Sequence, residues 1–178
     1  MTFEEYYKLD ESPMRIGEMP EDRNAYYENL EKSQLIKNGA ESIGKFENFE
    51  IYEFQKTPEL IDLYFFVGDR LAAFYSYQKL EQGIRTMLSW NSIYYSGTFR
   101  YIFLNYLLDR FLHIKSDYLM SRRGIRFWKQ IIRDLPDGYQ AYHQMEMKVV
   151  PLNDPDEIED YIFKSSDQKQ SFFGIIYL

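Results

Sequence analysis

Apolar residues in the middle of the chain follow the period of β-strands. A nearly continuous apolar run at Leu63–Val67 is followed by the turn Gly68-Asp69 and by a second apolar run at Leu71–Tyr77. After the turn Gln82-Gly83, the segment Ile84–Ser92 alternates apolar and polar positions, as a half-buried strand does. The pattern predicts an antiparallel meander of three strands.

Beyond Ser92 the period of the pattern becomes helical. Apolar side chains recur every three or four residues and predict a helix with a broad apolar stripe, formed by Phe99, Ile102, Phe103, Tyr106, Leu107 and Phe111. Further elements are expected in the order of a short strand, a helix, a strand, a short helix and a last strand: His113–Ser116, Arg122–Leu135 with Ser121 as N-cap, Tyr139–Val150, Asp154–Tyr161 and Phe172–Leu178.

The N-terminal part differs from the rest by its helical and acidic character. One helix is predicted from Pro20 to Asn38-Gly39, with acidic residues in its first turn that complement the helix dipole. Its expected buried side consists of Tyr26, Tyr27, Leu30 and Ile36. Aromatic and β-branched residues from Phe49 to Phe54 predict the first strand. We therefore expect one domain over residues 1–178, with a helical N-terminal extension at 1–45 and a sheet-and-helix core at 46–178.

Composition excludes several classes of chemistry. The chain has no Cys, which excludes disulfides, thiolate nucleophiles and zinc–thiolate sites. His113 and His143 have no carboxylates at ligand spacing, so we expect no metal site. We expect no signal peptide from the acidic first residues, and no apolar run reaches the about 20 residues that span a bilayer. We expect a cytoplasmic protein without a membrane partner.

Charge is distributed unevenly along the chain. Residues 1–62 contain 7 Lys and Arg against 15 Asp and Glu, whereas residues 100–148 contain 9 against 5. The basic helix Arg122–Arg133 could meet nucleic acid, but the acidic remainder makes nucleic acid an unfavourable partner. The basic segment could also meet a small anionic ligand or be a solvated helix face.

The turn between the third strand and the long helix is the best candidate for a binding site. Its sequence Tyr94-Tyr95-Ser96-Gly97-Thr98-Phe99 places backbone N–H groups at a helix N-terminus, which suits a phosphate or pyrophosphate. Ser96 and Thr98 could donate to a phosphate or cap the helix. Asp117 could face a ligand or form local hydrogen bonds that fix the next loop.

The order of these elements resembles the GNAT superfamily of N-acyltransferases. The segment Tyr94–Phe99 lies where that superfamily carries its (Gln/Arg)-x-x-Gly-x-(Gly/Ala) loop for acyl-CoA. Ser116-Asp117, followed by Gly124 and Phe127-Trp128, is similar to a pattern of GNAT-like proteins encoded by bacteriophages. The resemblance covers residues 63–148. It implies an α/β (α+β) fold with a mixed, mainly antiparallel central sheet flanked by helices on both faces.

The resemblance also implies a function. An acyl group would pass from acetyl-CoA or another acyl-CoA to an amine, with the pyrophosphate held by Tyr94, Tyr95, Ser96, Gly97, Thr98 and Phe99. The acyl cleft would be lined by Trp90, Asn91, Ser116 and Asp117. The tyrosine acid of the superfamily aligns with Trp128, so Tyr118 and Tyr95 are the substitutes that we consider for proton transfer.

Departures from the loop motif favour an alternative. Tyr94 stands at the Gln/Arg position, and Phe99 stands at the final small position, where its side chain would crowd the phosphate loop. The alternative is a catalytically degenerate phage protein of GNAT-like fold, which binds a host or virion protein in the host cytoplasm. Its surface, rich in Tyr and acidic residues, suits a protein interface.

Overall fold

The computed structural model describes residues 20–117, 122–145, 147–158 and 171–178. The helices are α2 (Pro20–Glu28), α3 (Lys32–Lys37), α4 (Thr98–Ile102), α5 (Leu108–Phe111) and α6 (Arg122–Arg133), with the 3-10 turn η1 (Ile93–Tyr95) and the π-helical segment η2 (Phe103–Leu107). The strands are β1 (Glu41–Phe46), β2 (Phe49–Gln55), β3 (Leu60–Val67), β4 (Arg70–Lys79), β5 (Ile84–Asn91), β6 (His113–Lys115), β7 (Tyr139–Met145), β8 (Lys148–Leu152) and β9 (Ser171–Tyr177).

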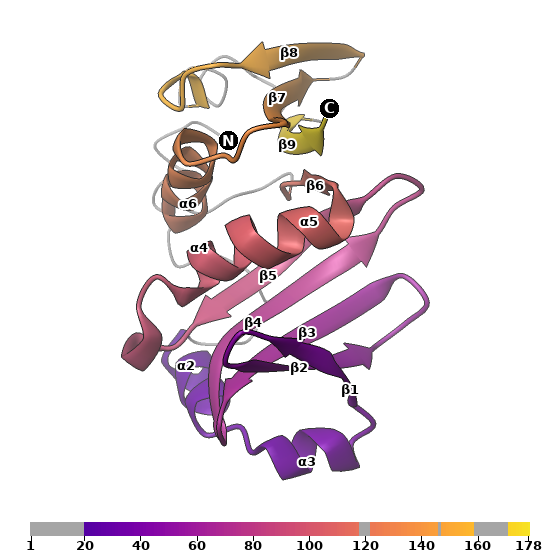
Figure 1. Cartoon of the computed structure of the whole chain (residues 1–178), viewed down its shortest axis with the longest axis vertical. Helices are drawn as coiled ribbons and strands as arrows, with labels where there is room; N and C mark the ends of the chain where they lie inside the picture. Colours follow the sequence, from indigo (N-terminus) through magenta and orange to yellow (C-terminus); the bar gives the residue numbers. More distant parts are fainter. Residues whose placement is uncertain (1–19, 118–121, 146, 159–170) are drawn as a thin grey trace.

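The strands form one large, mostly antiparallel sheet in an α+β fold. Its order is β1-β2-β3-β4-β5-β6-β9-β7-β8, so β9 lies between β6 and β7. The predicted three-strand meander is confirmed as β3, β4 and β5, and β1 and β2 extend it on one side (Figure 1). The last predicted strand is confirmed as β9, whereas Tyr139–Val150 is a hairpin, β7 and β8, rather than one strand.

Strands β5 and β6 are the only parallel pair among the described strands, and their contact is short. Ile84 pairs with Ile114 and Arg85 pairs with Lys115, and no later residue of β5 pairs with β6. The continuous helical segment α4–η2–α5 connects the two strands and runs beside β5 (Figure 1). The second half of β5, which leads into the loop before α4, therefore has a ladder partner only on its β4 side.

Side chains of the sheet divide between two hydrophobic clusters. Tyr75 of β4 packs on Phe99 of α4, with ring centroids 5.5 Å apart. Its neighbour Phe74 stacks on Tyr27 of α2 at 4.8 Å. Because successive strand residues point to opposite faces, the apolar run of β3 is buried on both of its faces, which explains why it lacks polar alternation.

A β-bulge in β5 changes which cluster its apolar residues join. Ser76 of β4 pairs with Leu88, but the next residue, Tyr77, pairs with Thr86, so Met87 is an extra residue. Ile84 therefore belongs to the cluster that includes α4 and α6, whereas Leu88 and Trp90 belong to the cluster that includes α2. The alternation of this strand had suggested a single buried face.

The N-terminal helix predicted as continuous is two helices. The chain leaves α2 after Glu28, and the Asn29 side-chain amide donates to the Ala25 carbonyl at 2.8 Å. This side-chain bond competes with continuation of the helix. Tyr27 is buried as predicted, but Tyr26 is 58% exposed and Ile36 is 47% exposed, because α3 turns Leu35 into the core instead.

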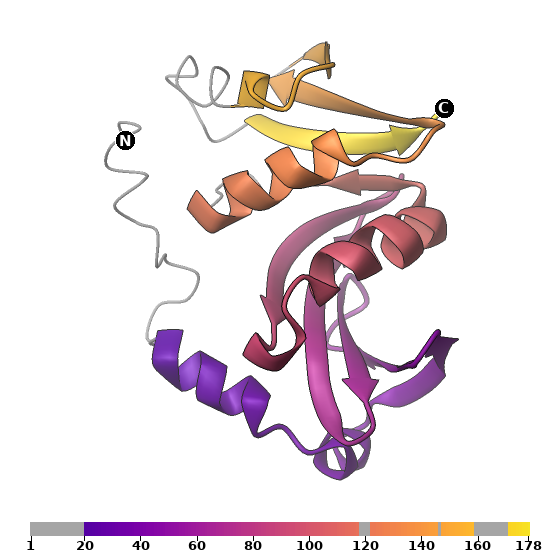
Figure 2. The same cartoon turned by 60° about the vertical axis from the view of Figure 1, so that its left-hand side comes forward.

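The two helices after the meander agree with the sequence pattern. The segment α4–η2–α5 buries Phe99, Ile102, Phe103 and Leu107 as predicted, and α6 buries Trp128. Figure 2 shows α6 lying alongside β9 and β6. Ser121, the expected N-cap, lies outside the described residues, as does the end of the helix predicted at residues 154–161.

Candidate functional site

The loop from Ser92 to Gly97 is shaped by the side chain of Asn91. The Asn91 amide nitrogen donates to the carbonyl oxygens of Ser92 at 2.7 Å and Tyr95 at 2.8 Å. Its amide oxygen accepts from the backbone N–H of Phe99, in the first turn of α4, at 2.7 Å. Asn91, predicted as a cleft residue, therefore fixes the loop and fills one of the donors that a phosphate would otherwise use.

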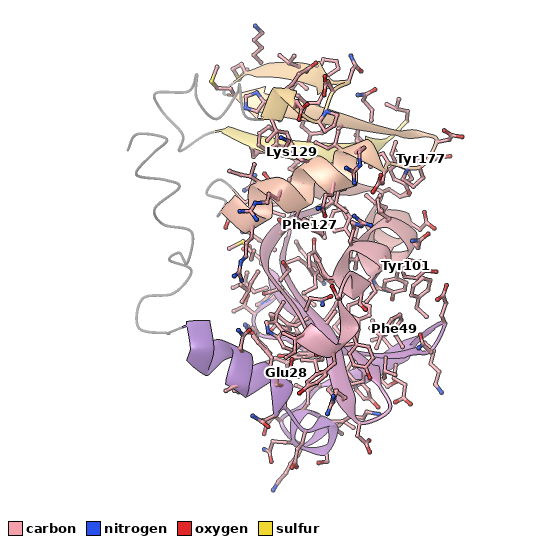
Figure 3. The ribbon with its side chains drawn as sticks, turned by 90° about the vertical axis from the view of Figure 1, so that its left-hand side faces the viewer. Glu28, Phe49, Tyr101, Phe127, Lys129 and Tyr177 are labelled. Carbon is pink, nitrogen blue, oxygen red and sulfur yellow. The ribbon has the colours of Figure 1, made fainter. Side chains whose placement is uncertain are left out.

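A second side chain reaches the same loop from the N-terminal part of the chain. The Glu28 carboxylate, at the end of α2, accepts from the Ser92 hydroxyl at 2.9 Å and from the Ile93 N–H at 3.3 Å. Asn24 accepts from the Trp90 indole N–H at 2.8 Å. Figure 3 shows Glu28 beside the start of α4. The Glu28 carboxylate, an anion, therefore already accepts from the backbone N–H of Ile93, the first residue of η1.

Three backbone N–H groups in the loop remain available to a ligand. Within the described parts of the chain, those of Ser96, Gly97 and Thr98 make no hydrogen bond. Gly97 has a φ of 77°, a left-handed conformation that favours glycine, and a Cβ built on it would meet nothing within 4 Å. The loop therefore presents unpaired donors to open space at the N-terminal end of a helical segment.

These donors border a surface cavity of about 370 Å³. It is lined by Phe49, Ser96, Gly97, Thr98, Arg100, Tyr101, Leu104, Asn105 and Asp134. The Arg100 guanidinium lies 3.9 Å from the Asp134 carboxylate, and both side chains are partly exposed. Such an exposed pair contributes little to stability, so Arg100 can exchange Asp134 for an anionic ligand.

One wall of the cavity is held by a bond between distant parts of the chain. The Tyr101 hydroxyl donates to the Glu47 carboxylate, and this hydrogen bond raises the pKa of Tyr101. Figure 3 shows Tyr101 and Phe49 on the same side of the molecule. Tyr101 therefore stays protonated at neutral pH and can donate, but the bond to Glu47 already uses its proton.

Phe99 does not crowd the loop, which corrects the expectation from the motif. Its side chain is buried and its ring packs on the rings of Tyr75, Phe103 and Phe127. The space next to Gly97 is open because Phe99 points into the core. Of the six predicted loop residues, Ser96, Gly97 and Thr98 line the cavity, whereas Tyr94, Tyr95 and Phe99 do not.

The predicted cleft residues other than Asn91 have structural contacts of their own. Trp90 is buried in the cluster that includes α2. The Ser116 hydroxyl is fully buried, donates to the Asp117 carbonyl at 2.9 Å and accepts from the Phe173 N–H at 2.9 Å. Ser116 thereby extends the β6–β9 pairing, and Asp117 beside it is half-buried.

Of the two tyrosines predicted for proton transfer, only Tyr95 belongs to the described residues. Tyr118 lies outside the described residues. Tyr95 is half-buried, packs against the core, and its carbonyl accepts from Asn91. A group that the sequence did not indicate is the Tyr75 hydroxyl, which is buried without a partner in the described residues. Burial raises the pKa of Tyr75 well above its usual value, so it can donate a proton in a hydrogen bond but not accept one from an amine.

Sequence reasoning also missed Glu28, Asn24, Arg100 and Asp134. Glu28 and Ile93 are 65 residues apart, and no local pattern links a helix end to a loop at that distance. Arg100 carried a signal, because a cation in the first turn of a helix is unfavourable for the helix dipole and indicates another role.

Replacing Asn91 tests whether it holds the loop. We expect Asn91→Ala to lower the free energy of unfolding by about 2 kcal/mol, because the Phe99 N–H and two carbonyls lose their partner. Urea unfolding measures this. Asn105→Ala is the matched control, since Asn105 is exposed and donates only to the Tyr101 carbonyl. Equal losses in the two variants would refute the assignment.

Within the described residues, no group of three or more His, Cys, Asp or Glu side chains could hold a metal ion. No helix in the described ranges is long and apolar enough to cross a membrane. No family model, no curated protein and no solved structure matches the chain.

Proposed function

We propose that this chain is a GNAT-like N-acyltransferase that binds acyl-CoA through the loop at Ser96–Thr98. The observation that carries the proposal is the open cavity beside Gly97, which is lined by three residues whose backbone N–H groups make no hydrogen bond within the described parts of the chain. A pyrophosphate there would meet backbone donors, the positive end of a helical segment and the Arg100 guanidinium, as oxyanion recognition requires.

The arrangement of strands supports this reading. Parallel β5 and β6 stop pairing after Arg85 and Lys115, six residues before β5 ends at Asn91 and enters the loop, and the bulge at Met87 further turns β5. A parallel pair that separates before one of its strands reaches a phosphate loop can admit the pantetheine arm and thioester between the two strands. The position of β9 between β6 and β7, and the division of helices between two clusters, agree with a sheet flanked on both faces.

In the reaction that such a site would support, the main task of the protein is to hold the amine and the thioester in position. The acceptor's amine nitrogen attacks the thioester carbonyl carbon, the C–S bond breaks, and the proton lost by nitrogen ends on the CoA sulfur, which leaves an amide and free CoA. Holding the two reactants in one geometry supplies much of the rate. The protonated Tyr75 hydroxyl, on β4 next to β5, is a candidate hydrogen-bond donor, alongside Tyr95 and Tyr118.

Calorimetry with CoA and acetyl-CoA tests the proposal, with two variants at one position. We expect the wild type to bind both ligands and Thr98→Glu to bind at least about 30-fold more weakly, because a carboxylate would repel the pyrophosphate. Thr98→Gln is the matched neutral control and should keep most of the affinity. Glutamate in a first helical turn complements the dipole, so the loss would not reflect unfolding.

Absence of binding at millimolar CoA would refute the acyl-CoA site. Equal affinities of Thr98→Glu and Thr98→Gln would refute its placement at this loop. Transfer itself is measured as release of free CoA thiol in the presence of amines.

The second candidate is a binding module of the same fold without catalysis, directed at a host or virion protein. The observation that favours it is the exposure of two large apolar side chains beside the loop: Ile93 is 77% exposed and Tyr94 is 63% exposed. The Arg70 guanidinium lies 4.3 Å from the Tyr94 ring centroid, which presents the ring as a rigid surface. A pull-down from bacterial lysate with wild type and Ile93→Ser tests it, and CoA binding without a stoichiometric partner would count against it.

A further inference from the structure

The cavity beside the loop has a second wall, which supplies none of the unpaired backbone donors. This wall consists of Phe49 of β2 and of Tyr101, Leu104 and Asn105 of the segment α4–η2–α5. None of the four side chains is charged, so the wall does not attract phosphate. A cavity of about 370 Å³ is typical of sites that enclose a whole small molecule. The second wall therefore suits an uncharged part of the ligand.

Tyr101 provides a fixed aromatic surface on this wall. Its side chain is 43% exposed, yet it is held in place by two contacts. The hydroxyl donates to the Glu47 carboxylate, and the ring packs on the ring of Phe46 with centroids 6.1 Å apart. A ring that is already fixed loses little conformational entropy when a planar ligand stacks on it. Aromatic side chains of this kind form the stacking surfaces on which proteins bind nucleobases.

Asn105 has hydrogen-bonding groups that the fold does not use. Its side chain is exposed, and its amide nitrogen donates to the Tyr101 carbonyl at 2.9 Å. The amide oxygen accepts no hydrogen bond from any described residue. An asparagine amide offers one acceptor and one donor side by side, which match the N6 amino group and N7 of adenine. Guanine has the acceptor O6 in place of the amino group, so Asn105 favours adenine over guanine.

The backbone around Asn105 also points to a binding role. Asn105 lies in the π-helical segment Phe103–Leu107, and such segments are rare and frequently occur at functional sites. By the rise of a helix, Asn105 lies about 12 Å from Gly97 along the helix axis. This is the scale of the distance between the diphosphate and the base in a nucleoside diphosphate. One ligand of that class can therefore reach both the loop and the second wall.

We propose that Tyr101, Leu104 and Asn105 bind the adenine base of an adenine nucleotide whose diphosphate lies at the loop. Tyr101 stacks on the base, Leu104 adds apolar contact, and Asn105 selects adenine by its two hydrogen bonds. The inference rests on the proposed function, because acyl-CoA is the ligand that would bring an adenosine diphosphate to this loop. It adds a specificity for the base that the unpaired backbone donors alone do not provide.

Calorimetry of the full chain with ADP, GDP and inorganic pyrophosphate tests the site. We expect the wild type to bind ADP about tenfold more tightly than either of the other two ligands. Tyr101→Leu should bind ADP about tenfold more weakly and keep its affinity for pyrophosphate, which shows that the loop is still folded. Asn105→Ala should lose the preference for ADP over GDP. Tyr177→Leu is the matched control, since Tyr177 is an exposed tyrosine on β9 that does not line the cavity.

Three results would each overturn the adenine site: equal affinities of the wild type for ADP and pyrophosphate, an ADP affinity that Tyr101→Leu leaves unchanged, or a preference for ADP over GDP that persists in Asn105→Ala. Titration with CoA separates this inference from the proposed function. Binding of CoA without a preference for ADP over pyrophosphate overturns the adenine site and leaves the acyl-CoA site standing. Binding of ADP without binding of CoA does the reverse.

Discussion

Gly83→Ala is expected to lower the free energy of unfolding by about 3 to 4 kcal/mol, a large effect for one methyl group. Gly83 lies in the turn before β5 with a φ of +78°, where a Cβ would be 2.1 Å from the backbone oxygen of His113 and 2.8 Å from its Cβ. The methyl group therefore meets backbone, which cannot rotate away. Relief requires β6 to move from β5 and to weaken the short pair at Ile84 and Ile114.

Gly68→Ala is the matched control for this prediction. Gly68 also occupies a hairpin turn, with a φ of +59°, but a Cβ there meets nothing within 4 Å. It should cost only the backbone strain, about 1 kcal/mol. Urea unfolding compares the two at constant m-value. Asn substitutions sharpen the test, since Asn tolerates the left-handed region: Gly68→Asn should be nearly neutral and Gly83→Asn should stay strongly destabilised. Similar losses at both positions would mean that the approach of β6 to Gly83 is not required.

Acidification is expected to destabilise the protein through His143. This residue of β7 is 2% exposed, its ring lies 5.2 Å from that of Phe173, and burial lowers its pKa to about 4. The unfolded chain binds this proton near pH 6.5, whereas the native state does not until about pH 4. The unfolded state therefore binds more protons between these values, and stability falls by about 2 to 3 kcal/mol as pH falls from 6.5 to 4.

Comparison with His143→Phe isolates this contribution from the titration of carboxylates. The free energies of unfolding at pH 7 and pH 4.5 should differ less in His143→Phe than in the wild type. His113→Phe serves as the matched variant: burial lowers the pKa of His113 as well, so its removal should act in the same direction. A wild type and a His143→Phe variant with the same pH dependence would contradict the assignment.

Local patterns were sufficient for the elements that bury one or two continuous faces. The run at Leu63–Val67 and the helical stripe at Phe99–Phe111 depend on neighbours within a few residues, and β3 and α4–η2–α5 formed where they were predicted. The hairpin β7–β8 was missed because its turn has no Gly or Pro signal. Strand β1 was missed because most of its side chains are exposed and give no apolar pattern.

The sequence indicated the loop that borders the cavity, but not most of the side chains around it. Gly97 was found because a glycine before a helical stripe is a local signal, and its positive φ explains why glycine is there. The bonds that decide which donors remain available come from Asn91 and Glu28. Only Asn91 is close in sequence to the loop. The side chain of Phe99 was misjudged because its direction depends on the packing of Tyr75 and Phe127 around it.

By itself, the sequence determined the meander, the helix that follows it and the loop between them, because strand and helix periods are properties of short segments. The tertiary structure alone decided which face each side chain joined. One bulge residue, Met87, moved Leu88 and Trp90 to the cluster on the other side of the sheet from Ile84. The tertiary structure also brought Glu28 to the loop and set Arg85 beside Lys115. Contacts between segments distant in sequence fix these positions, and no local period encodes them.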